Sequence, residues 1–206
     1  MVLIIFVLGI FISVPTAFVE MGLLNIFQKY ITSAILFSLI SAFIGIALIE
    51  ETAKYSVLKT KVLGSSEFDE PVDVMLYMII AALGFAAAEN ILILSGSSHF
   101  EFFETATISA FRFVGATFLH ALCSGALGYF IAVSFRLVKN KRKFLALGFA
   151  LVIFLHGTYN LSILNIEGNQ KFLIPLAVLI SLTLFVNWGF HKLKKLKSVS
   201  KINLEA

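Results

Sequence analysis

The sequence predicts an all-α protein, a polytopic bundle of about six transmembrane helices. Of its 206 residues, 59% are hydrophobic and 14% are charged, whereas soluble domains carry roughly 45–50% apolar and about 25% charged residues. Apolar stretches of about 20 residues, the length that crosses a bilayer, recur six times along the chain. Because no low-complexity linker or internal repeat divides the sequence, residues 1–206 are expected to form a single integral-membrane domain.

The six stretches are joined by more polar connections. The first, Val2 to about Val19, lacks the basic start and small-residue cleavage site of a signal peptide, so we expect a transmembrane helix, kinked at Pro15. The second starts at Ile31 and is expected to continue as helix to Lys61. The other four are expected at about 74–94, 105–137, 144–164 and 172–190.

The distribution of basic residues predicts the orientation, because lysine and arginine concentrate in cytoplasmic loops. Six crossings place the second-to-third loop, the fourth-to-fifth loop and the tail at 191–206 on one side. Both termini are therefore expected in the cytoplasm, with the tail against anionic lipid headgroups, and the net charge of +4 requires no nucleic-acid partner. Most of the 16 basic residues lie on that side: Lys54, Lys59, Lys61, Arg136, Lys139, Lys141, Arg142, Lys143, Lys192, Lys194, Lys195, Lys197 and Lys201.

Polar side chains lie inside four of the predicted spans. At about 1.5 Å per residue, the glutamates and histidines among them lie roughly 16 to 22 Å from the ends of their helices. Since a charged side chain at a helix centre costs about 2.5–3.5 kcal/mol on insertion scales, these groups are expected to face one another, a metal ion or a water-filled cavity. The set is Glu50, Glu51 and Lys54, then Glu89 and Asn90, then Arg112 and His120, then His156 and Asn160.

Each of these residues alone also permits a structural interpretation. The charged residues three and four positions apart in 50–54 could simply form ion pairs where the helix leaves the membrane. Glu89 could be a protonated carboxyl that is hydrogen-bonded to Asn90 or to hydroxyl groups. Either histidine could be a packing residue, and Arg112 could snorkel or pair with a nearby glutamate. Independent accidents would not share one depth on four helices, so the functional interpretation is favoured.

Helical spacing relates these groups to one another. Residues four apart lie one turn apart on the same face, whereas the adjacent Glu50 and Glu51 diverge by about 100° around the axis. The two carboxylates are therefore expected to differ in role. The same-face pairs are Glu50 with Lys54, Phe85 with Glu89, and His156 with Asn160.

Four segments, in this order along the chain, resemble the successive motifs of the PrsW family of intramembrane proteases. They are "EETAK", "EPVDVMLYMIIAALGFAAAEN", "FLHALCSGALGYF" and "FLHGTYN", which together run from about 49 to 160. The PrsW family is grouped with the CPBP superfamily, which includes the CAAX endopeptidases. The resemblance implies a protease of the prokaryotic cell membrane whose active site lies within the bilayer.

The resemblance also implies roles for individual residues and a class of substrate. Family members cleave membrane-anchored proteins, notably anti-sigma factors, on the extracytoplasmic side. Lys54, Asn90 and Arg112 are expected to support the catalytic residues. Those catalytic residues are Glu50 and Glu51, which would activate water, Glu89 and His120 of the middle motifs, and His156 and Asn160, which would stabilise the oxyanion.

Two mechanisms stay open for this residue set. Peptide hydrolysis needs a base for water and donors for the oxyanion, which glutamate, histidine and asparagine supply. Alternatively, Glu50, Glu89, His120 and His156 could hold a divalent ion such as Zn²⁺ with a bound water; the helical H-E-x-x-H zinc signature is absent from the sequence. A proton-coupled transporter and a non-catalytic membrane scaffold are the alternatives from other functional classes.

The orientation is tested with reporter fusions at the C-terminus, near Ser97 and near Lys141. We expect cytoplasmic signals from the first and third fusions and an exported signal from the second, because the basic segments stay in the cytoplasm. An exported signal from the fusion near Lys141 would contradict the six-span topology.

Overall fold

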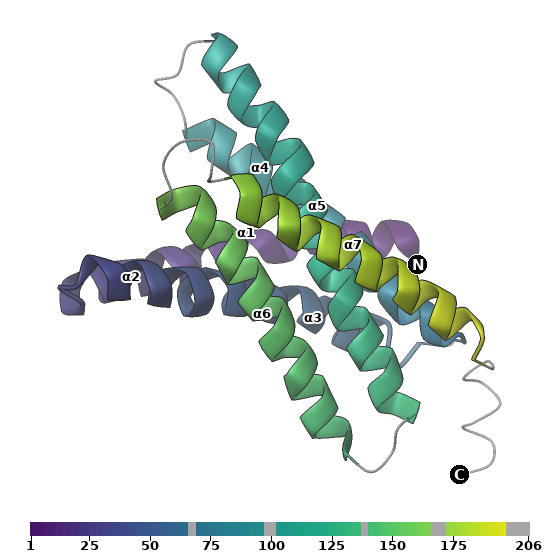
Figure 1. Ribbon diagram of the computed structural model, residues 1–206. Helices are drawn as coiled ribbons and strands as arrows, with labels where there is room; N and C mark the ends of the chain where they lie inside the picture. Colours follow the sequence, from purple (N-terminus) through teal and green to yellow (C-terminus); the bar gives the residue numbers. More distant parts are fainter. Residues whose placement is uncertain (66–68, 97–101, 137–139, 166–171, 197–206) are drawn as a thin grey trace.

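The computed structural model describes residues 1–65, 69–96, 102–136, 140–165 and 172–196, without the side chains of 96, 102–113 and 136. These residues form helices and no strand (Figure 1). The elements are α1 (Val2–Tyr30), α2 (Ala34–Ile40), the π-helix η1 (Ser41–Leu48), α3 (Ile49–Lys61), α4 (Pro71–Gly96), α5 (Phe102–Arg136), α6 (Lys141–Asn165) and α7 (Leu173–Lys194).

Six helices in the described part of the chain are long and apolar enough to cross a membrane. Five are the single helices α1, α4, α5, α6 and α7, and the sixth is the continuous rod of α2, η1 and α3, from Ala34 to Lys61. The predicted fold class, a polytopic all-helical bundle, is confirmed.

The expected end of the first helix at about Val19 was wrong, because α1 passes through Pro15 and reaches Tyr30. Glutamate is a good helix former, so Glu20 interrupts the run of apolar residues without interrupting the helix. The buried residues of α1 are Ile5, Gly9, Ser13 and Thr16, and Glu20 lies one turn beyond the last of them.

The second span contains a feature that the sequence did not predict. Its helix begins after Ser33, whose hydroxyl accepts a hydrogen bond from Leu36 N at 3.4 Å, and it continues to Lys61 as expected. In between, residues 41–48 form η1, a π-helix that ends immediately before Ile49 and the glutamate pair. Wider π turns change the direction in which later side chains point, and they occur frequently at functional sites.

Helix α5 is the centre of the bundle: 78% of its membrane-spanning window is buried, against 22–33% for the other spans. Close helix contacts at glycines hold α4 to α5, and α1 to α4. A Cβ added at Gly128 of α5 would lie 2.7 Å from the Met75 backbone, and one at Gly84 of α4 would collide with the Phe6 carbonyl. Small residues allow helix backbones to approach closely in membrane bundles. Such contacts help to bring together the helices that carry the predicted site residues.

Candidate active site

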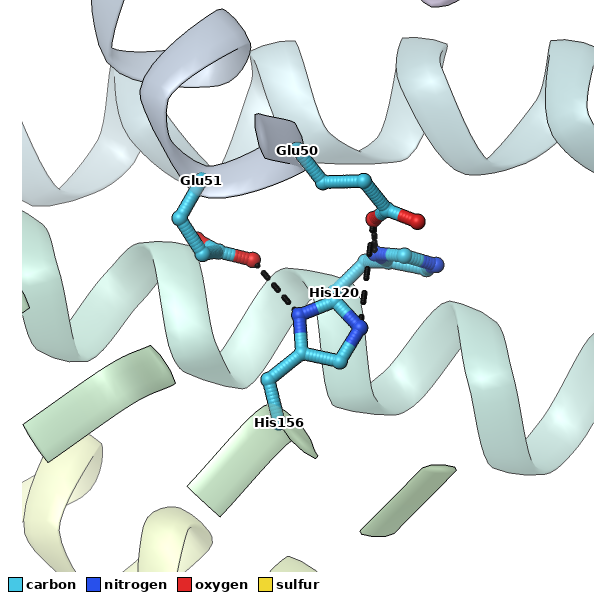
Figure 2. Close-up of side chains that lie close together, drawn as sticks. All are labelled: Glu50, Glu51, His120 and His156. Carbon is cyan, nitrogen blue, oxygen red and sulfur yellow. Dashed lines mark hydrogen bonds and ion pairs between the residues drawn. The ribbon is translucent and has the colours of Figure 1, made fainter. Parts of the chain in front are cut away.

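Five buried polar side chains from three helices meet inside the bundle. Glu50, Glu51 and Lys54 come from the first turns of α3, His120 from α5 and His156 from α6. Each is at most 3% exposed. Figure 2 shows both carboxylates of α3 directed at the two imidazoles, whose rings pack edge to face with centroids 5.2 Å apart.

Lys54 is the cation of this cluster. Its Nζ lies 3.1 Å from Glu50 Oε2, 2.9 Å from Glu51 Oε1 and 2.7 Å from His120 Nδ1. An ammonium has three N–H donors and no acceptor capacity, so these three contacts use all of its donors. The prediction that Glu50 and Lys54 share a face is confirmed, and Glu51 also reaches the ammonium, from the neighbouring helical position.

The contacts of the two histidines fix which ring nitrogen carries the proton. His120 Nδ1 accepts from Lys54, so its hydrogen is on Nε2, which lies 2.8 Å from Glu89 Oε2. His156 Nδ1 lies 3.0 Å from Glu51 Oε1, and because a carboxylate only accepts, Nδ1–H is the donor there. Nε2 of His156 then carries a lone pair on the side of Glu50 Oε2, 3.8 Å away.

Helix α4 covers one side of the cluster. The Phe85 ring lies 4.7 Å from Lys54 Nζ and 5.8 Å from the His120 ring. Glu89 is one turn further on and contacts His120, so the predicted shared face of Phe85 and Glu89 is confirmed. Asn90 Nδ2 donates to Thr117 Oγ1 at 3.1 Å, which ties α4 to α5 beside the site rather than to Glu89.

The local sequence explains why His156 can reach the glutamates. The residue after it, Gly157, lies against the Phe43 ring of η1, where any Cβ would collide with that ring. Glycine therefore lets α6 approach the π-helix closely. The final turn of η1 leads directly into Glu50 and Glu51, so the contact between α6 and η1 sets the distance between His156 and Glu51.

Two of the predicted site residues remain, Asn160 and Arg112. Asn160 is half-buried, one turn from His156 on α6, and makes no hydrogen bond with any described residue of the site. The Arg112 side chain lies outside the described residues. A cavity of about 350 Å³ lies between α2, α6 and α7, with Ser38, Thr158 and Asn165 in its wall, and its lining includes neither Asn160 nor the five clustered residues.

Sequence analysis missed Glu20 on α1, which interacts electrostatically with Glu50, Glu89 and Lys54. The first span was expected to end at about Val19, so Glu20 lay outside the segments that were searched for polar side chains. The available signal was its spacing: seven and four residues before it stand Ser13 and Thr16, which are buried on the same helix. Ser124 was also missed; its hydroxyl makes a long contact of 3.5 Å with Glu51 Oε2.

The cluster has the donors for a metal ion, although not the predicted set. Glu50, Glu51, His120 and His156 each offer one ligand atom, and these four atoms lie within 4.8 Å of one another. Glu51 thus replaces the predicted Glu89, whose carboxylate contacts the far nitrogen of His120. Carboxylate oxygens and imidazole nitrogens suit zinc, so the donor set fits, but Lys54 already contacts three of the four side chains.

Replacing Lys54 by methionine should destabilise the protein by about 3–5 kcal/mol, because removing one partner leaves buried carboxylates unpaired. The free energy of unfolding in mixed micelles measures the effect. Lys59→Met, on an exposed position of the same helix, should change it by less than about 0.5 kcal/mol. The pair Glu51→Gln with Lys54→Met should lose less than the sum of the two single variants; full additivity would contradict a coupled ion pair.

Comparison with known proteins gives the family. Residues 1–188 match the model of the "PrsW family intramembrane metalloprotease". A protein named Protease PrsW from Geobacillus kaustophilus is 39% identical over 119 residues, which cover 58% of this chain and 50% of that protein. The aligned region therefore spans half the length of that relative.

Two other relatives align over more of their length. Protease PrsW of Oceanobacillus iheyensis is 31% identical over 85% of this chain and 75% of its own length. The Bacillus subtilis protein of that name is 29% identical over 79% of this chain and 70% of its own. No solved structure matches the chain. The chain belongs to the PrsW family of intramembrane metalloproteases.

Proposed function

We propose that this protein is an endopeptidase of the bacterial cell membrane that hydrolyses a peptide bond of membrane-anchored proteins of the anti-sigma-factor type. The observation that carries this proposal is the buried cluster of two glutamates, one lysine and two histidines inside a six-span bundle. Family membership and relatives named as proteases support it. The basic loops and tail support an orientation with both termini in the cytoplasm.

The contacts of the two glutamates support a different role for each of them. Glu51 uses Oε1 for Lys54 and His156, and its Oε2 faces Ser124. Glu50 directs Oε2 at Lys54 and His120, whereas its Oε1 has no hydrogen-bond partner among the described residues. We therefore assign Glu50 as the general base, with Oε1 accepting the proton of the attacking water, and Glu51 as the residue that orients His156 and Lys54.

His156 is placed to return that proton. Glu51 holds the hydrogen on Nδ1, so the Nε2 lone pair on the Glu50 side can take up a proton and donate it to the leaving amine. Water thus supplies the hydroxyl of the new carboxyl group and, through Glu50 and His156, the hydrogen of the new amine. His120 holds Lys54 from the other side, and Glu89 fixes the His120 tautomer.

Asn160 is assigned to the oxyanion. Its amide is a suitable donor, and it lies one turn from His156 on the same helix. Because Asn160 is half-buried and makes no hydrogen bond with the described residues of the cluster, we expect the substrate carbonyl to lie between this helix turn and Glu50. The family resemblance supports the same assignment.

A divalent ion such as Zn²⁺ also fits this site. Glu50, Glu51, His120 and His156 would hold it, and a bound ion would supply a Lewis acid for the carbonyl and a more acidic water. The charges support this, because the carboxylates of Glu50 and Glu51 share the ammonium of Lys54, with which Glu20 also interacts electrostatically. A bound ion would compete with the Lys54 ammonium for Glu50, Glu51 and His120.

Changing Glu50 or Glu51 to glutamine should lower the rate of substrate cleavage by roughly 10²- to 10⁴-fold, the usual effect of losing a general base. His156→Ala and Asn160→Ala should each lower it by about 10²–10³-fold. The assay is cleavage of a tagged single-span anti-sigma factor in proteoliposomes. Glu70→Gln, at an exposed position outside the cluster, is the matched control and should leave the rate unchanged.

Wild-type cleavage by a correctly inserted double variant, Glu50→Gln with Glu51→Gln, would refute the catalytic assignment. That result is what a non-catalytic scaffold predicts. A proton-coupled transporter would instead show substrate-dependent proton uptake and no cleaved product.

Zinc binding has a readout that does not need activity. Added Zn²⁺ should raise the thermal stability of the purified wild-type protein, by about 2.7 kcal/mol when the ion is 100-fold above its dissociation constant. His156→Ala should abolish the shift, because it removes a ligand, whereas His191→Ala, at an exposed position on α7, should keep it. An equal shift in both variants would place the zinc elsewhere.

A further inference from the structure

Glu20 has a buried acceptor that the rest of the described structure leaves unused. Its Oε1 is shielded from solvent and has no hydrogen-bond partner among the described residues. Buried polar side-chain atoms nearly always have such a partner, either in the protein or in a bound molecule. An exception beside a candidate active site indicates an interaction that forms only when something else binds.

The inward face of α1 leads to this residue. Ile5, Gly9, Ser13 and Thr16 are buried at helical spacing, and Glu20 follows four residues after the last of them, on the same face. The hydroxyls of Ser13 and Thr16 donate to carbonyls of their own helix, Ile10 O and Ile12 O, both at 2.7 Å. These two hydroxyls are therefore satisfied within α1, whereas the Oε1 atom of Glu20 is available to accept a hydrogen bond from a bound molecule.

The register between α1 and the second span places Glu20 at the depth of the cluster. The two rods form an antiparallel hairpin joined by residues 31–33. A Cβ at Gly45 would lie 3.4 Å from Leu24 and 3.2 Å from Phe27. One turn back along α1 from Leu24 is Glu20, and one turn forward from Gly45 is Ile49, immediately before Glu50.

Electrostatics agree with this register. Glu20 interacts with Glu50, Glu89 and Lys54 through charge, whereas its Oε1 has no hydrogen-bond partner among the described residues. Its carboxyl therefore lies beside the cluster and outside the network that holds Lys54.

We propose that Glu20 is a substrate-binding residue of this site, and that its Oε1 accepts a hydrogen bond from a backbone N–H of the substrate's membrane segment. This inference rests on the proposed protease function. A peptide bond in a helix has to leave the helical pattern before water can attack its carbonyl, which frees backbone N–H groups. Inside a bilayer such groups need an acceptor from the protein, and Glu20 supplies one at the right depth.

The glutamine variant separates hydrogen bonding from charge. A glutamine side chain keeps an acceptor oxygen, so Glu20→Gln should bind substrate nearly as the wild type does. Glu20→Leu has a similar volume and no acceptor. It should raise KM for the single-span anti-sigma factor in proteoliposomes by about 5- to 100-fold, the equivalent of one lost buried hydrogen bond, with kcat within about twofold. Ser13→Ala and Thr16→Val are the controls on the same face and should change neither constant.

Two results would overturn the assignment of Glu20 and leave the protease function standing. One is an unchanged KM in Glu20→Leu. The other is an equal loss of kcat in the leucine and glutamine variants, which would indicate that the charge of Glu20 matters. If the leucine variant fails to insert, Glu20→Met takes its place, with the same expected rise in KM. A wild-type protein that cleaves nothing under these conditions would instead refute the proposed function, and this inference with it.

Discussion

The structure depends on one interaction: a buried ammonium group held between two buried carboxylates. Lys54 is 0% exposed and contacts Glu50, Glu51 and His120. Isolated buried charges are strongly unfavourable, and a buried ion pair is tolerated only when its geometry is good and its remaining polar atoms are satisfied. The positions of α5 and α6 follow, since each helix must bring a histidine to this group. The glycine contact at Gly157 lets α6 come close to η1, and the one at Gly128 lets α5 pack closely against α4.

This arrangement also explains how carboxylates can work as chemical groups in a bilayer. Glu51 is fixed by two strong contacts, whereas Glu50 keeps an oxygen with no hydrogen-bond partner among the described residues. One carboxylate therefore orients the site and the other is left for the reaction. Because the orienting contacts are formed within the protein before substrate arrives, little rearrangement is needed during the reaction itself, which is how preorganised polar sites lower barriers.

Much of this architecture could be predicted from the sequence, because hydrophobicity and helical spacing determine it directly. The six spans, the continuous helix to Lys61 and the shared faces of Glu50 with Lys54 and of Phe85 with Glu89 all follow from those patterns. The π-helix does not, since nothing in 41–48 distinguishes it from an ordinary apolar helix. Glu20 was missed because an acidic residue after an apolar run looks like a helix end, whereas α1 continues past it to Tyr30. The four side chains that could hold a metal ion include Glu51 and not the predicted Glu89. This too depends on the direction of each side chain, and the roughly 100° turn between neighbouring helical positions does not fix that direction from sequence alone.

The most direct test of the account is to follow the oxygen of water. A single-span anti-sigma factor is cleaved by the full-length protein in proteoliposomes prepared in H₂¹⁸O, and the products are analysed by mass spectrometry. The account predicts one ¹⁸O atom in the new terminal carboxyl group and a cut within the membrane segment, since Glu50 and its partners lie inside the bundle. Cleavage confined to the soluble part of the substrate, or unlabelled products, would contradict water activation by the buried cluster.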